Sequence, residues 1–160
     1  MRIGLISDTH NKFHGGIPQA FAGVDAIIHA GDIGSPALLN ELEKIATVYA
    51  VLGNMDSPRR FPQLSDKLII EVEKIKILVV HDIISPEYFV HKVTHFTGSS
   101  KPDVVVFGHT HEFYFGRHQG IYFANPGSAT SPRDHRHPTV GILKIQSQNQ
   151  IDLQRIELPE

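Results

Sequence analysis

The sequence IGLISDTH, residues 3–10, begins with a short apolar run and ends in two residues that can bind a metal ion, Asp8 and His10. An apolar run this short is typical of a strand that is buried on both faces. The same order, an apolar run followed by polar residues, returns four more times along the chain. We therefore expect a sheet whose strand ends carry the chemistry of the protein.

The later runs end in Gly31-Asp32, in Gly53-Asn54 with Asp56, in His81, and in Gly108-His109-Thr110-His111. Together with Asp8 and His10, they supply three carboxylates, one carboxamide and four imidazoles. Oxygen and nitrogen donors of this kind suit two divalent transition metals. Two such ions need a shared oxygen ligand, and Asp32 at the end of its strand is the candidate. The set predicts a metallohydrolase.

The composition indicates one ordinary globular domain, which we expect to span residues 1–160. The net charge is -2 and no long basic run occurs, so nothing supports a general surface for nucleic acid or for an anionic membrane, although an RNA or DNA substrate stays open. Cysteine is absent, which excludes disulfides, thiolate ligands and cysteine nucleophiles. Because residues 1–7 lack the long apolar region of a signal peptide and no transmembrane-length stretch follows, we expect a cytoplasmic protein.

The apolar pattern predicts strands at Ile3–Ile6, Ala26–Ile28, Val48–Leu52, Leu68–Val72, Ile75–Val80, Val104–Phe107, His111–Arg117, Gly120–Ala124, Thr139–Ile145 and Ile151–Ile156. Helices are predicted at Ile17–Ala22, Ala37–Ile45 and Glu87–Phe96. The first half alternates strand and helix, as in parallel βαβ units, whereas the second half favours antiparallel pairing. The predicted fold is α/β, with two packed sheets, one mostly parallel and one mixed, and helices outside.

The ordered motifs resemble those of the calcineurin-like metallophosphoesterases, which are D-x-H, G-D, G-N-x-[DE], H and G-H-x-H. The match runs from Met1 to about Arg133. The Asn125-Pro126-Gly127-Ser128 loop and the Pro132-Arg133 pair after it resemble, more closely, the branch of small microbial phosphodiesterases of the YfcE type. The resemblance implies a four-layer αββα sandwich of two mixed sheets flanked by helices, and a dinuclear site that hydrolyses phosphate esters.

The resemblance also implies the ligand sets. One ion would take Asp8, His10, Asp32 and His111, and the other would take Asp32, Asn54, His81 and His109. A hydroxide that bridges the ions would attack phosphorus, with Asp32, Asn54 and His109 as the catalytic residues and no protein nucleophile. We expect two divalent ions per chain, manganese first, with nickel, iron, cobalt or zinc as alternatives.

Two positions depart from the family pattern. Met55 stands after Gly53-Asn54, where many relatives have a histidine that helps to protonate the leaving group. Because methionine cannot donate that proton, we expect activated diesters to be better substrates than monoesters with poor leaving groups. The triplet Val80-His81-Asp82 stands where the branch usually has His-Gly-His. Two roles are open for Asp82: it orients His81 or extends the site, or it caps the next turn.

Four further residues are predicted to act outside the ligand set. Asp56 is expected to fix its loop as a hydrogen-bond acceptor, and His29 is expected to be a buried histidine that hydrogen-bonds near Asp32. His14 and Arg133 are candidates for substrate contact, and the Arg133 guanidinium suits bidentate binding of a phosphate. His91 and His95 have the spacing of a zinc pair, but a surface helix is the favoured interpretation. A solvated turn is favoured for residues 135–137.

Other functions stay open at this point. One is a non-catalytic interaction scaffold with the same fold, as the related retromer subunit suggests. Another is a nuclease or cyclic-nucleotide phosphodiesterase, whose cleft would be lined by Phe13, Tyr88, Phe89, Phe113 and Tyr114. The same aromatics equally suit a core or a contact in a homo-oligomer. Because all seven ligand positions hold suitable residue types, we favour catalysis on a small phosphate ester.

Overall fold

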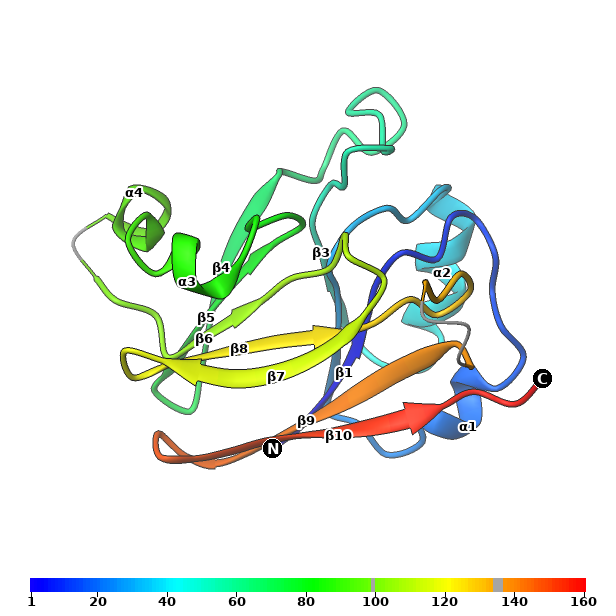
Figure 1. Cartoon of the computed structure of the whole chain (residues 1–160). Coiled ribbons are helices and arrows are strands. Elements are labelled where there is room, and N and C mark those ends of the chain that lie inside the picture. Colours follow the sequence, from blue (N-terminus) through cyan, green and yellow to red (C-terminus); the bar gives the residue numbers. More distant parts are fainter. Residues whose placement is uncertain (99, 134–136) are drawn as a thin grey trace.

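The computed structural model describes residues 1–98, 100–133 and 137–160, and these form two five-stranded sheets (Figure 1). The first sheet has the strand order β10-β9-β1-β2-β3 and contains β1 (Arg2–Ile6), β2 (Ala26–His29), β3 (Val48–Ala50), β9 (Thr139–Ser147) and β10 (Gln150–Glu157). The second has the order β4-β5-β6-β8-β7 and contains β4 (Lys67–Val72), β5 (Ile75–Val80), β6 (Val104–Val106), β7 (Phe113–His118) and β8 (Ile121–Pro126).

In the described part of the chain, four short helices cover the outer faces of the sheets. They are α1 (Ile17–Ala20), α2 (Pro36–Glu43), α3 (Pro86–Phe89) and α4 (Val93–Thr97). Phe21 after α1 and Leu42 of α2 pack in one apolar cluster with the first sheet, and Phe89 and Val93 pack in another with the second sheet. Figure 1 shows α1 and α2 on one side of the molecule and α3 and α4 on the other. The predicted four-layer αββα arrangement is confirmed.

The apolar runs of β1, β5 and β6 are buried on both faces, as the sequence predicts, whereas the run of the edge strand β4 is largely exposed. In β1, Ile3 and Leu5 point into the core between the sheets, whereas Ile6 belongs to the cluster under α1 and α2. In β5, Ile77 and Val79 face the first sheet, and Leu78 packs toward α3. Because side chains alternate across a strand, a strand covered on both sides must be apolar throughout.

Both sheets are mixed, as the family resemblance implies, so the expectation of one mostly parallel sheet from the apolar pattern alone is wrong. In the first, β1, β2 and β3 are parallel, but β9 and β10 add antiparallel pairs beside β1. In the second, β5, β6 and β8 are parallel, and β4 and β7 are antiparallel edge strands. The last hairpin returns to the first strand of the chain, a long-range pairing that no local pattern encodes.

The predicted helix Glu87–Phe96 is two helices. Between α3 and α4, the N–H of His91 bonds the carbonyl of Tyr88, and the N–H of Lys92 bonds that of Phe89. Each of these bonds joins residues three positions apart, whereas the bonds of an α-helix join residues four positions apart. The α-helical pattern is therefore interrupted between α3 and α4. His91 therefore lies in the turn and His95 in α4, and the two do not share one helix face.

Among the described residues, no helix is both long and apolar enough to cross a membrane.

Candidate metal centre

Asp8 is the most enclosed of the predicted ligands. It follows β1, is fully buried, and its Oδ2 accepts hydrogen bonds from the Ser7 hydroxyl at 2.6 Å and from the His109 backbone N–H at 3.0 Å. Its other oxygen, Oδ1, is buried and has no hydrogen-bond partner within the part of the chain that is described. A buried carboxylate oxygen without a donor is costly, and a cation is the partner that its charge favours.

Two imidazoles face this unpaired oxygen. His111 Nε2 lies 3.3 Å from Asp8 Oδ1, His10 Nε2 lies 3.9 Å from it, and the two imidazole nitrogens are 3.4 Å apart. His111 Nδ1 donates to the Ser131 carbonyl at 2.7 Å, which leaves Nε2 as the nitrogen with a lone pair. The ligand atoms of these two histidines and Asp8 all lie within 4.8 Å of one another, so one ion can reach all three.

Asp8, His10 and His111 form a first donor group, and Asp32 connects it to a second donor group around His81. Asp32 Oδ1 accepts the Met55 N–H at 2.8 Å, and its Oδ2 lies 3.9 Å from His10 Nε2 and 3.4 Å from His81 Nε2. His81 Nδ1 donates to the Ala30 carbonyl at 2.7 Å, so Nε2 is left for a ligand. The two buried aspartates and His81 also have ligand atoms within 4.8 Å of one another. One oxygen of Asp32 thus faces histidines of both groups.

Asn54 and His109 extend the second group. Asn54 Oδ1 lies 3.0 Å from His81 Nε2 and 3.3 Å from His109 Nδ1. The other ring nitrogen, His109 Nε2, lies 3.7 Å from Asp82 Oδ2, an arrangement in which a carboxylate can orient a ligand histidine. Asp82 Oδ1 also accepts the Ile84 N–H at 2.9 Å. Asp82 therefore caps the turn that follows, and the imidazole it faces is His109.

The backbone is left-handed at five of the predicted ligands. The φ angles are 54° at Asp8, 46° at His10, 56° at Asp32, 70° at His109 and 61° at His111. A non-glycine residue pays about 1–2 kcal/mol for such a conformation, and strain of this kind concentrates at functional sites. These turns follow the ends of β1, β2 and β6.

The strand predicted at His111–Arg117 begins two residues later than expected, because the chain turns at His109 and again at His111. The left-handed turns at both histidines exclude an extended backbone, and β7 begins only at Phe113. The turn sends His109 toward Asn54 and His111 toward Asp8, so each histidine joins a different donor group.

Burial and hydrogen bonding oppose each other at the centre. Burial acts to raise the pKa of Asp32, but hydrogen bonds from His81 and from the Met55 N–H outweigh it and hold that pKa below its ordinary value. Burial acts to lower the pKa of His81, but hydrogen bonds with Asp32 and the Ala30 carbonyl outweigh it, so this pKa is raised. A positive charge is therefore favoured between the two buried carboxylates.

Asp56 fastens two of the turns together. Its carboxylate accepts the N–H of Ile33 at 3.0 and 3.1 Å, that of Gly34 at 3.1 Å and that of Gly53 at 2.9 Å. These donors belong to the segments that carry Asp32 and Asn54. The contacts are those of a loop-fixing acceptor, as the sequence predicts for this residue.

His29 is buried behind the centre and is neutral. Its Nδ1 accepts the Gly31 N–H at 3.1 Å, so Nε2 carries the proton and donates to the Thr9 hydroxyl at 3.0 Å, which donates to the Ile33 carbonyl at 2.8 Å. Desolvation by burial, aided by the charge of His81, lowers the pKa of His29 to about 3. The ring thus ties the turn after β1 to the turn after β2.

The Asn125–Ser128 loop has a structural role that the sequence did not reveal. Asn125 Nδ2 donates to the Gly108 carbonyl at 3.1 Å and to the Thr110 hydroxyl at 3.0 Å, and Ser128 donates to the Asp8 carbonyl at 2.9 Å. These bonds hold the turns that carry Asp8, His109 and His111. The Asn-Pro-Gly-Ser motif was the available signal, but its partners are distant in sequence.

The two predicted substrate residues, His14 and Arg133, are in neither of the two groups of candidate ligands. His14 Nδ1 accepts the Gly16 N–H at 2.9 Å and so fixes the turn that leads into α1. Arg133 is exposed and follows Ser131, whose carbonyl holds His111. Of the predicted turn at residues 135–137, His137 lies 3.9 Å from Glu160, and residues 135 and 136 are outside the described part.

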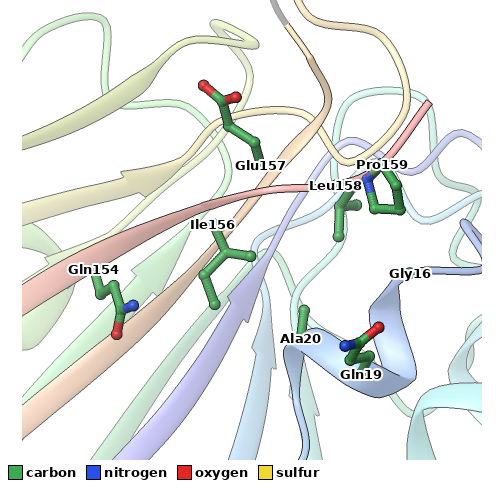
Figure 2. Close-up of a pocket in the computed structure, with 8 residues that line it drawn as sticks. All are labelled: Gly16, Gln19, Ala20, Gln154, Ile156, Glu157, Leu158 and Pro159. Carbon is green, nitrogen blue, oxygen red and sulfur yellow. The ribbon is translucent and has the colours of Figure 1, made fainter.

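A pocket of about 540 Å³ lies away from the donor groups (Figure 2). It lies between α1 and the end of β10 and is lined by Gly16, Gln19, Ala20, Gln154, Ile156, Glu157, Leu158 and Pro159. None of these residues is a predicted ligand. The polar donors converge at the strand ends, outside this pocket, so the strand ends are the candidate for the metal site.

The chain belongs to the calcineurin-like phosphoesterase superfamily, whose domain model matches residues 1–148. It is 36% identical to a probable metallophosphoesterase of Methanocaldococcus jannaschii over 168 residues, which cover 100% of this chain and 83% of that relative. Membership in this family implies divalent metal ions, and the resemblance seen in the sequence motifs is confirmed.

Solved structures with the same fold include enzymes and a sorting protein. An archaeal phosphodiesterase has a TM-score of 0.75 at 27% identity, covering 99% of this chain and 100% of that one. YfcE of Escherichia coli, a phosphoesterase, has a TM-score of 0.69 at 20% identity, with 99% and 100% covered. Vps29 of Entamoeba histolytica complexed with zinc has a TM-score of 0.75 at 22% identity, with 98% and 99% covered. The last two likenesses show a shared fold.

Proposed function

We propose that this protein is a phosphodiesterase that uses two divalent metal ions held at the ends of its strands. The observation that carries the proposal is the unpaired, buried Oδ1 of Asp8 among imidazoles, with Asp32 Oδ2 facing both donor groups. One ion would be held by Asp8, His10, Asp32 and His111, and the other by Asp32, Asn54, His81 and His109.

Bound divalent ions would acidify a water molecule and neutralise the charge that develops on a phosphoryl group. The protein contributes the positions of the ligands. Hydrogen bonds from His81 to the Ala30 carbonyl and from His111 to the Ser131 carbonyl fix which ring nitrogen is free. Asn54 turns its oxygen toward His81 and His109, which leaves its amide nitrogen to donate to a phosphate oxygen. Asp32, Asn54 and His109 are therefore our candidates for contact with the reacting groups.

Met55 supports a diester as the substrate. Its side chain is 71% exposed and follows Asn54, so the position next to the centre is filled by a group that cannot donate a proton. A leaving group with a high pKa would depart without an acid to protonate it. We therefore expect an aryl diester to be hydrolysed faster than an alkyl monoester, and a strong preference for the monoester would contradict this substrate class.

The test is a screen of mono-, di- and cyclic phosphate esters with chelated protein to which manganese, nickel, iron, cobalt or zinc is returned singly. We expect chelation to abolish diester hydrolysis and manganese to restore it best. Asp32→Asn should remain inactive with every metal, whereas Asp152→Asn, at an exposed position of β10, should match the native protein. Turnover that survives chelation, or that Asp32→Asn retains, would overturn the proposal.

The second candidate is an interaction scaffold, and the likeness to Vps29 favours it. The same screen separates the two functions, because a scaffold would bind metal without turning over any ester. The complete donor set supports catalysis.

One core shared by both sheets supports the prediction of a single domain over residues 1–160.

A further inference from the structure

A second pocket, of about 330 Å³, includes in its lining Asp82, which faces the predicted ligand His109. It lies over α3 and α4 and the turn that precedes them, and is lined by Asp82, Ile83, Ile84, Tyr88, Phe89, Lys92, His95 and Phe96. Apolar and aromatic side chains form most of this lining. A hollow of this size accommodates a single aromatic ring.

Ile84, at the edge of this pocket, is both strained and exposed. Its φ angle is 68°, which is a rare conformation for a β-branched residue, and 71% of its surface is accessible. The N–H of Ile84 is held by Asp82 Oδ1 at 2.9 Å, and the Ser85 N–H bonds the Ile83 carbonyl at 2.8 Å. A strained backbone thus holds an apolar side chain in solvent, and strain of this kind concentrates at sites that contact ligands.

Asp82 connects the pocket to the centre. One of its oxygens holds the Ile84 turn, and the other lies 3.7 Å from the Nε2 atom of His109, which belongs to the second donor group. A phosphate bound at the donor groups would therefore have one of its ester substituents at the mouth of the pocket. The carboxylate at this mouth repels a second anion, so an uncharged substituent is favoured inside.

The walls favour a flat ring. Tyr88 is 46% exposed, and the Lys92 ammonium lies 5.9 Å from the centre of its ring. Phe89 and Phe96 pack with ring centres 4.9 Å apart and close the floor toward the core. Aromatic faces bind planar rings by stacking.

We propose that this pocket holds the aromatic ring of an aryl-type or nucleobase-bearing phosphate ester, and that Ile84 and Tyr88 determine specificity for it. The inference rests on the proposed function, because it takes the metal centre as the place where the phosphate binds. It names the substrate class as diesters with an aromatic substituent.

The test compares two non-hydrolysable ligands that differ only in the substituent, phenylphosphonate and methylphosphonate, by calorimetric titration of the manganese-loaded protein. We expect phenylphosphonate to bind about tenfold more tightly, which is the gain in affinity expected from stacking one ring. Ile84→Ala and Tyr88→Ala should each remove most of this preference and leave methylphosphonate affinity unchanged. Tyr49→Ala is the matched control, because Tyr49 is 38% exposed but lies on β3, outside the pocket.

The outcomes separate the two proposals. Equal affinity for both phosphonates, or a preference that survives both pocket substitutions, would overturn the pocket assignment and leave the phosphodiesterase proposal standing. If neither phosphonate binds the metal-loaded protein and no ester is turned over, the metal centre itself is not a phosphate site, and both proposals are overturned.

Discussion

Removing the Asp56 carboxylate should loosen the metal centre without removing a ligand. In Asp56→Ala, three backbone N–H groups lose the acceptor that joins the turn of Asp32 to the turn of Asn54. A hydrogen bond to a charged group contributes about 1.5–3 kcal/mol, but Asp56 is only half-buried and water replaces part of the bonding, so we expect a net loss of about 3 kcal/mol. Asp56→Asn keeps one acceptor oxygen and should lose about half of that.

The assay is urea unfolding of the chelated protein, which excludes any contribution from bound metal. Asp152→Asn, at an exposed position of β10, should shift stability by less than about 0.5 kcal/mol. A metal titration then completes the test, because loosened turns should lower metal affinity about 10- to 100-fold while two ions still bind. Unchanged stability in Asp56→Ala, together with loss of one bound ion, would refute the reasoning and make Asp56 a ligand.

Three further predictions concern the same centre. Asp32→Asn should abolish binding of both ions, whereas Asp8→Asn should chiefly weaken the binding of one. A calorimetric titration that counts the bound ions shows whether each aspartate binds both ions or only one. Because the pKa of His29 is lowered to about 3, only the unfolded chain takes up this proton between pH 6.5 and about 3. Stability should therefore fall through that window as the pH falls, by about 1.4 kcal/mol per pH unit from this group. Urea unfolding of chelated His29→Gln should lack this component, and an unaltered pH dependence would contradict the assignment. Gly53→Ala would place a Cβ against the Asp32 carboxylate and should cost metal affinity, whereas Gly15→Ala meets no atom within 4 Å and should bind metal like the native protein.

The sequence by itself determined the family, the fold class and the set of residues that could bind metal. Strands could be read from short apolar runs because burial on both faces requires apolar residues at every position, as β1 and β5 show. The donors could be read because Asp8, Asp32, Asn54 and His81 stand directly after such runs, where strand ends converge. These are local properties, and a local pattern is sufficient to reveal them.

Only the tertiary structure decided how the donors are grouped and what supports them. His109 and His111 are two residues apart, yet their left-handed turns assign them to different groups. Asp82 faces His109 across a gap of 27 positions in the chain, and Ser128 holds the Asp8 carbonyl from 120 positions away. The return of β9 and β10 to β1, which makes the first sheet mixed, is likewise long-range. Local patterns specify which side chains are apolar or polar, but distances between remote segments are set by the packing of the two sheets against each other.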